Sequence, residues 1–147
     1  MRAVTCVILL FCPAVGWADD AKTIVTGSQG DRHLKFEGGL GTYYEGLVVA
    51  LLGDCSSESG ATVATKERWE KTLKGDHLRI QFAKPRRFMV TGEPPEVEAD
   101  EILVPISASQ APDHILVRSG KTYRAFAKYR YNICSFIQNE LKSLPAR

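Results

Sequence analysis

The sequence predicts an α+β domain in which an antiparallel, hairpin-rich sheet packs against two helices, expected at about residues 43–52 and 132–143. Polar and apolar residues alternate strictly over residues 77–82, which is typical of a strand with one buried face. Near the end of the chain, a Ser-Gly pair separates two apolar runs, as in a hairpin turn. The apolar side chains of residues 132–143 fall near one stripe, which indicates an amphipathic helix.

The first eighteen residues have the layout of a secretory signal peptide. Arg2 gives a positive start, an apolar run follows, and Gly16-Trp17-Ala18 places small residues at the two positions that a signal peptidase reads. We therefore expect cleavage after Ala18 and a periplasmic or extracellular protein, with residues 19–147 as one domain. No apolar run reaches the roughly 20 residues needed to span a bilayer, so no transmembrane segment is expected after signal removal.

The cysteines fit an exported protein. Two of the four leave with the signal, and Cys55 and Cys134 remain. A lone pair in an exported domain predicts one disulfide, which would close a loop of roughly 80 residues and contribute on the order of 4 kcal/mol. The alternative of a lipoprotein acylated at Cys12 is disfavoured by the bulky Phe11, which stands where a small residue is expected. Neither a C-x-x-C redox pair nor a zinc-ligand spacing occurs among the remaining cysteines and histidines.

Charge and composition narrow the class of protein. Loss of Arg2 leaves a net charge of about +1, one less than that of the full chain. Such a balance predicts neither a nucleic-acid binder nor a protein drawn strongly to membranes. No sequence pattern calls for a cofactor.

The first half of the domain is expected to contain two short strands, a flexible glycine turn and a helix. The expected strands and turn are residues 22–26, 33–37 and 38–41. Thr42 and Glu45 have the spacing of a capping box, ahead of the apolar run 47–52, and Gly53 suits a helix end. This favours a buried helix over residues 43–52, with a buried strand as the alternative.

A hairpin is expected next, with arms Thr62–Thr72 and His77–Ala83 around the turn Lys74-Gly75-Asp76. Residues 84–87 would end the second arm, and residues 88–90 would begin another strand. An acidic, proline-bearing loop is then expected at residues 92–100, followed by a strand at residues 102–106. Pro105 suggests that this last strand lies at an edge of the sheet, because proline donates no ladder hydrogen bond.

A second hairpin joins His114–Val117 to Tyr123–Tyr129. A three-residue loop, Arg118-Ser119-Gly120, sets His114 opposite Arg124 and separates the two faces better than a two-residue loop at Ser119-Gly120. The terminal helix at residues 132–143 would carry Cys134 in its first turn.

The second hairpin also carries the best candidate for a binding surface. Basic and aromatic residues alternate over residues 123–131, where guanidinium and ammonium groups suit anionic ligands and tyrosines stack on sugars or peptides. The alternative is an ordinary strand with one buried face and one solvated basic face. The candidate ligand-binding residues are Arg118, Ser119, Tyr123, Arg124 and Lys128.

The segment Ser119-Gly120-Lys121-Thr122-Tyr123 has the pattern Ser-Gly-x-x-Tyr. It resembles a motif of small periplasmic inhibitors of C-type lysozyme, in which a loop enters the cleft of the enzyme. The resemblance covers five positions, and that family is an all-β barrel without a terminal helix. A lysozyme inhibitor is therefore kept as a minor alternative.

No catalytic constellation is recognised: the serines lie in no nucleophile elbow, and no phosphate-binding loop follows a strand. We therefore expect a non-enzymatic binding or inhibitory module whose partner is a protein or an anionic envelope ligand. One alternative is an envelope enzyme with a site assembled from His77, His114 and Arg124. Another is a structural envelope protein that assembles through the Pro105 strand.

Overall fold

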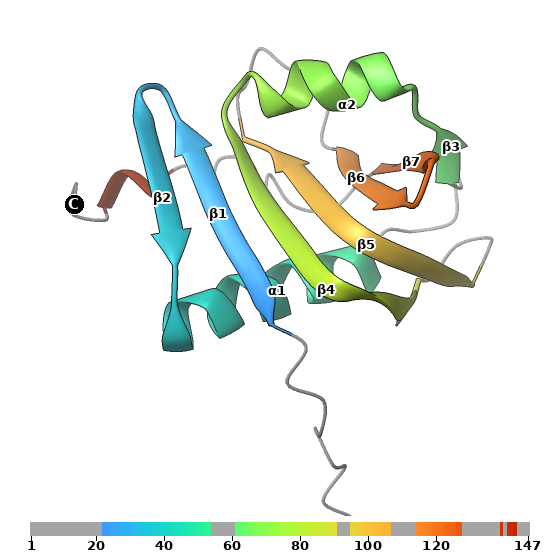
Figure 1. Ribbon diagram of the computed structural model, residues 1–147, viewed down its shortest axis with the longest axis horizontal. Helices are drawn as coiled ribbons and strands as arrows, with labels where there is room; N and C mark the ends of the chain where they lie inside the picture. The colour runs from blue at the N-terminus through green and yellow to red at the C-terminus, as the bar shows by residue number, and fades with distance from the viewer. Residues whose placement is uncertain are drawn as a thin grey trace, which may run out of the picture.

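A computed structural model describes residues 22–53, 61–90, 95–106, 114–127, 139 and 141–143. The predicted α+β class with an antiparallel sheet is confirmed (Figure 1). The strands lie in the order β2-β1-β4-β5-β6-β7-β3, and each pairs antiparallel with its neighbours. The elements in chain order are β1 (Thr23–Gln29), β2 (Arg32–Phe36), α1 (Gly38–Gly53), β3 (Ala61–Val63), α2 (Lys66–Leu73), β4 (His77–Met89), β5 (Glu96–Pro105), β6 (His114–Ser119) and β7 (Thr122–Ala127).

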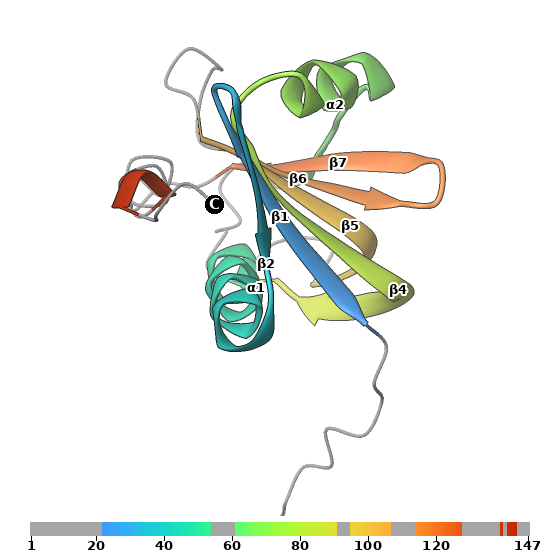
Figure 2. The ribbon, with the colours of Figure 1, turned by 60° about the vertical axis from the view of Figure 1, so that its left-hand side comes forward.

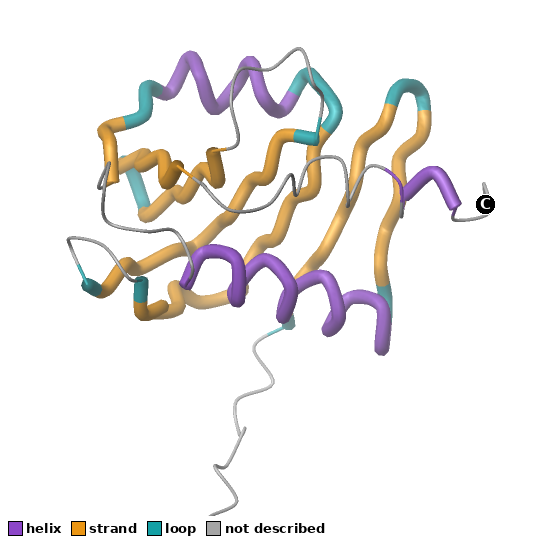
Figure 3. The backbone as a smooth tube through the Cα atoms, turned by 180° about the vertical axis from the view of Figure 1, so that it is seen from behind, coloured by secondary structure: helices purple, strands orange, loops and turns teal. Residues whose placement is uncertain are grey.

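The two helices cover opposite faces of the sheet, as Figure 2 shows. Seen from behind, α1 lies across the strands near one end of the sheet (Figure 3). The larger core lies on this α1 face, and a smaller cluster around Trp69 lies on the α2 face. Central strands are therefore buried on both sides: Ile102 faces the α1 core, and its neighbour Leu103 faces the α2 cluster.

The helix expected at residues 43–52 is confirmed, but it begins earlier, at Gly38. The predicted glycine turn and capping box are therefore wrong. Thr42 lies inside the helix, where its hydroxyl donates to the carbonyl of Gly38 over 3.3 Å. Gly41 allows close packing instead, because a Cβ at this position would lie 3.0 Å from the carbonyl oxygen of Phe36.

The predicted first arm Thr62–Thr72 is wrong beyond its first residues, because most of it forms α2. The Thr65 hydroxyl accepts a hydrogen bond from the amide of Arg68 over 3.1 Å and caps the helix. Trp69 and Thr72, three residues apart, then share the buried side of α2. The second arm at His77–Ala83 is confirmed as the start of β4.

β4 does not end at residues 84–87, as predicted, but continues to Met89. Its pairing with β5 shifts register between Gln81 and Arg86, and Pro85 lies within this irregularity, where no regular ladder bond is required of it. The predicted acidic loop at residues 92–100 is wrong from Glu96 onward, where β5 begins. Residues 91–94 lie outside the described residues.

The predicted edge position of Pro105 is also wrong. β5 lies between β4 and β6, and Pro105 is its last residue, opposite His77. Of the predicted helix at residues 132–143, the described residues 139 and 141–143 are helical. The rest of that helix lies outside the described residues, as do Cys55, Cys134 and the signal segment.

Candidate functional site

The hairpin β6–β7 differs from its predicted register. Ser119 pairs with Thr122, so the loop consists of Gly120 and Lys121. Val117 consequently faces Arg124, and the predicted pairing of His114 with Arg124 is wrong, because His114 lies opposite Ala127. Gly120 has a φ of +57°, as its position in this tight turn requires.

This register divides the predicted binding residues between the two faces of the sheet. Side chains alternate along a strand, so Arg118 and Tyr123 lie on the α2 face with Trp69. Ser119 and Arg124 lie on the opposite side of the hairpin, where they line a cleft. Lys128 lies outside the described residues. The four described candidates therefore do not form one continuous surface.

On the α2 face, the charge of Arg118 is already used within the protein. The carboxylate of Glu101 is fully buried, and it is flanked by Arg79, which donates to Oε1, and by Arg118, whose Nη2 lies 2.8 Å from Oε2 at ion-pair distance. Arg118 Nε also donates to Asp100 over 2.8 Å. Burial lowers the pKa of Arg118, but the bond to Asp100 and the charge of Glu101 outweigh it and raise that pKa above its ordinary value.

The aromatic residues of this face belong to the same packing unit. The rings of Trp69 and Tyr123 have centroids 5.6 Å apart, and Arg118 Cζ lies 5.9 Å from the Trp69 ring centroid. Arg118 and Tyr123 therefore join α2 to the hairpin. The Ser119-Gly120 turn is also bound within the protein, because the amide of Gly120 donates to Asp100 over 2.6 Å.

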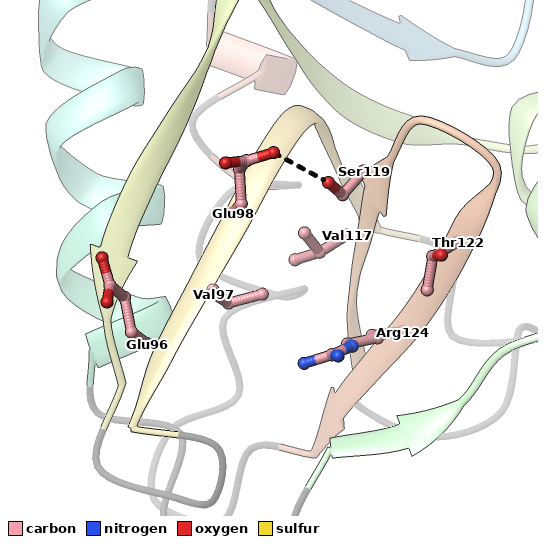
Figure 4. A pocket seen from close by; sticks show the side chains of 7 residues that line it. All are labelled: Glu96, Val97, Glu98, Val117, Ser119, Thr122 and Arg124. Carbon is pink, nitrogen blue, oxygen red and sulfur yellow. Dashed lines mark hydrogen bonds between the residues drawn. The ribbon is translucent and has the colours of Figure 1, made fainter.

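The cleft forms where β5 and β6 separate. Among the described residues, pairing between these strands extends only from Glu101 to Leu103 on β5, whereas the first half of β5 pairs with β4 alone. Between that half and the hairpin lies a cleft of about 180 Å³, shown in Figure 4. Its lining residues come from β5, β6 and β7 and are Glu96, Val97, Glu98, Val117, Ser119, Thr122 and Arg124.

The two walls of the cleft carry opposite charge. Val97 and Val117 point toward one another across it, with Arg124 on the β7 side and the glutamates on the β5 side (Figure 4). Glu98 accepts a hydrogen bond from the Ser119 hydroxyl over 3.4 Å. Both glutamates share one cation outside the cleft: Arg87 lies 3.8 Å from Glu96 and 3.7 Å from Glu98.

Arg124 differs from the other arginines of the hairpin region. Its side chain is half-buried and points into the cleft (Figure 4), and it has no hydrogen-bond or ion-pair partner among the residues that the structure describes. A guanidinium remains charged at every physiological pH and presents several N–H donors in a plane. Arg124 is therefore suited to receive a carboxylate or another planar anion.

The histidines are not brought to this cleft. His77 is buried at the start of β4, where its Nδ1–H donates to the carbonyl of Gly75 over 2.8 Å. Burial lowers the pKa of His77 below 6.5. His114 lies at the start of β6, and neither histidine lines the cleft that holds Arg124. Within the described part of the chain, no group of His, Cys, Asp and Glu side chains is arranged to hold a metal ion.

A larger hollow of about 550 Å³ lies beside β1, β2 and the start of α1. Its charged residues other than Lys22 form ion pairs with one another or with neighbours. Lys35 lies 2.7 Å from Glu37, and Glu45 accepts from Arg86, which also lies over the Phe82 ring. The remaining charged residue, Lys22, is exposed, whereas Arg124 is half-buried in its cleft.

The sequence-based candidates include Ser119 and Arg124, which line the cleft, but none of the residues of its β5 wall. The segment Glu-Val-Glu-Ala after the two prolines alternates charged and apolar residues, which is a strand signal. The acidic residues of this segment and the two prolines before it favoured a loop instead. The separation of β5 from β6 has no local sequence signal, because it results from how three strands meet.

Comparison of the chain with protein-family models, with curated proteins and with solved structures found no match. Among the described residues, no helix combines the length and the apolar character needed to cross a membrane.

Proposed function

We propose that this protein is a non-catalytic binding module whose cleft between β5 and the β6–β7 hairpin takes an anionic ligand on Arg124. The observation that carries the proposal is the half-buried guanidinium of Arg124, which lacks a partner among the described residues. Partly desolvated charges are normally paired, because burial of an unpaired charge is unfavourable. A ligand carboxylate or similar anion would supply the pairing.

The size of the cleft supports a ligand of which only part is enclosed. Its volume of about 180 Å³ is small beside the several hundred Å³ of a typical small-molecule pocket. A dinucleotide or other large cofactor would not fit. Part of a polymer, such as one or two side chains of a protein, would.

The setting of this module is part of the proposal. The signal-like residues 1–18 support export and cleavage after Ala18, and the remaining pair Cys55 and Cys134 supports a disulfide-bonded domain in the periplasm or cell exterior. The partner would then be a protein or an anionic component of the cell envelope.

The test is capture of partners from a native envelope extract by the immobilised protein and by Arg124→Gln. We expect the variant to lose most of the captured material, because Gln retains a polar side chain but lacks the charge and the planar donor set. Quantitative mass spectrometry of the captured fraction gives the measurement. Arg118 is unsuitable for this test, since its removal would take away one of the two arginines that flank the buried Glu101.

The matched control is Arg68→Gln, which removes an arginine from α2, on the other face of the sheet. It is expected to capture the same material as the unmodified protein. Equal capture by folded Arg124→Gln and Arg68→Gln would show that the cleft is not the binding site.

A further inference from the structure

We propose that the ligand of the cleft is an extended polypeptide segment that adds as a strand to the free edge of β5 and places a carboxylate on Arg124. This inference rests on the proposed function and specifies its ligand class. Three features support this proposal: the β5 edge, the apolar pair Val97 and Val117, and the guanidinium of Arg124.

The first part is the free edge of β5. Residues 96–99 pair with β4 on one side, so alternate residues direct their backbone N–H and C=O groups to the other edge of β5, which pairs with no described strand at these residues. The pairing with β6 begins only at Glu101, and no backbone bond from the described residues reaches residues 96–99 on the cleft side. An unpaired strand edge is a template for another strand.

The second part is the apolar pair Val97 and Val117, one on each wall of the cleft. Val97 and Val117 face one another across the cleft (Figure 4), and both are buried members of the α1-face core. A strand laid along β5 presents alternate side chains to this contact. One apolar side chain of the ligand would pack there, which matches the small volume of the cleft.

The third part is the distribution of charge. Glu96 and Glu98 share Arg87, which leaves the β5 wall with about one negative charge, whereas Arg124 gives the β7 wall one positive charge. A bound segment is therefore oriented with its carboxylate toward β7. The carboxylate is a Glu or Asp side chain or a chain terminus, since each offers two acceptor oxygens to the guanidinium.

A polypeptide fits these features better than an anionic glycan. A glycan would satisfy Arg124 through a carboxylate or phosphate, but it has no regular alternation of donors and acceptors to match residues 96–99. The free backbone edge is the feature that distinguishes the two ligand classes, and the experiment is designed around it.

The experiment is a selection of phage-displayed random hexapeptides on the purified protein, because such a library presupposes no sequence. Binders with an acidic residue or a free C-terminal carboxylate are expected. A selected peptide, made synthetically, should bind Arg124→Gln roughly 10- to 100-fold more weakly, the range expected for loss of a hydrogen bond to a charged group. The affinity of Arg124→Lys for the peptide should lie between those of the unmodified protein and Arg124→Gln. Arg68→Gln should bind within about twofold of the unmodified protein.

Two readouts report strand addition rather than charge alone. N-methylation of the peptide amides that face β5 should weaken binding at least about tenfold, whereas methylation of the intervening amides should not, because a strand alternates its hydrogen-bonding sides. Amide hydrogen exchange at residues 96–99 should slow at least about tenfold in the complex.

The outcomes separate this inference from the proposed function. If no peptide binds in an Arg124-dependent way, but envelope capture still requires Arg124, the cleft binds a non-peptide anion and the strand-addition proposal is overturned. Binding that tolerates every N-methyl group would overturn it as well. If neither peptide binding nor envelope capture depends on Arg124, both proposals fall.

Discussion

At the scale of single residues, the arginines of the hairpin region have different tasks. Arg118 is bound to Asp100 and lies against Glu101, whereas Arg124, six residues on, has no such partner among the described residues. Composition alone gives the two arginines equal weight as ligand-binding candidates. Their difference depends on which face of the strand each side chain takes, and that depends on the register of one hairpin.

The buried carboxylate of Glu101 should be decisive for stability. Glu101→Gln keeps the volume of the side chain but removes the charge that Arg79 and Arg118 share. We expect a loss of about 3 kcal/mol in the free energy of unfolding, because breaking this buried ion pair leaves Arg79 without its carboxylate and Arg118 with Asp100 alone. Urea denaturation measures this loss.

Glu98→Gln on the same strand is the control. Glu98 is exposed and lies 3.7 Å from Arg87, so its removal should change stability by less than about 1 kcal/mol. Equal effects of the two substitutions would mean that Glu101 does not hold the network together.

His77 should make stability depend on pH in a definite direction. Burial lowers its pKa in the folded protein below the ordinary value of 6.5, so the unfolded chain takes up a proton first as pH falls. The contribution of His77 is therefore fully present above pH 6.5 and is lost as pH falls from there toward the lowered pKa. His77→Asn should reduce the slope of unfolding free energy against pH in this window.

The main cause of this shift can be checked with salt. Desolvation is insensitive to ionic strength, whereas interactions between exposed charges are screened. The slope attributable to His77, measured as the difference between the protein and His77→Asn, should therefore persist at high salt. Its disappearance would assign the shift to the neighbouring charges instead.

At the scale of elements, predictions succeeded where one local pattern dominated. The alternation of His77–Ala83 identified the start of β4, and the apolar run 47–52 identified the body of α1. The same reasoning missed α2, because β-branched residues before it favoured a strand although Trp69 and Thr72 have helical spacing. Strand propensity and helical periodicity disagreed over this segment. The structure follows the helical periodicity, which buries Trp69.

The glycines of α1 illustrate how packing can override propensity. A Cβ added at Gly46 would meet no atom within 4 Å, so Gly46→Ala should stabilise the protein by roughly 0.5–1 kcal/mol through helix propensity alone. Gly41 lies against the backbone of β2, where a Cβ would meet the carbonyl oxygen of Phe36 at 3.0 Å. Gly41→Ala should therefore show no gain, and thermal denaturation compares the two. A gain of equal size at both positions would mean that α1 does not pack closely on Phe36.

At the scale of the whole molecule, the sheet order could not be read from local patterns. β1 pairs with β4, although β2, α1, β3 and α2 lie between them in the chain. β3 pairs with β7 at one edge of the sheet. Such pairings depend on which faces must be buried together, and the alternation along each strand is compatible with several orders. The cleft also depends on this long-range pairing. Among the described residues, β4 pairs with both halves of β5, whereas β6 pairs only with residues 101–103.

The same long-range pairing bears on the predicted disulfide. Ala61 of β3 lies opposite Phe126 of β7. Cys55 precedes Ala61 by six residues in the sequence, and Cys134 follows Phe126 by eight. Because both cysteines lie outside the described residues, the disulfide stays a prediction from the sequence.

Intact mass of the exported protein tests export and the disulfide together. We expect the mass of residues 19–147 less two hydrogen atoms, and no thiol that reacts with a labelling reagent after unfolding without reductant. Reduction should lower the free energy of unfolding by on the order of 4 kcal/mol, because the bridge closes a loop of roughly 80 residues in the unfolded chain. Two reactive thiols in the unreduced protein would rule out the bridge, and a mass that retains residues 1–18 would rule out the cleavage. Since the two outcomes change the mass by different amounts, a single measurement distinguishes a failure of export processing from a failure of disulfide formation.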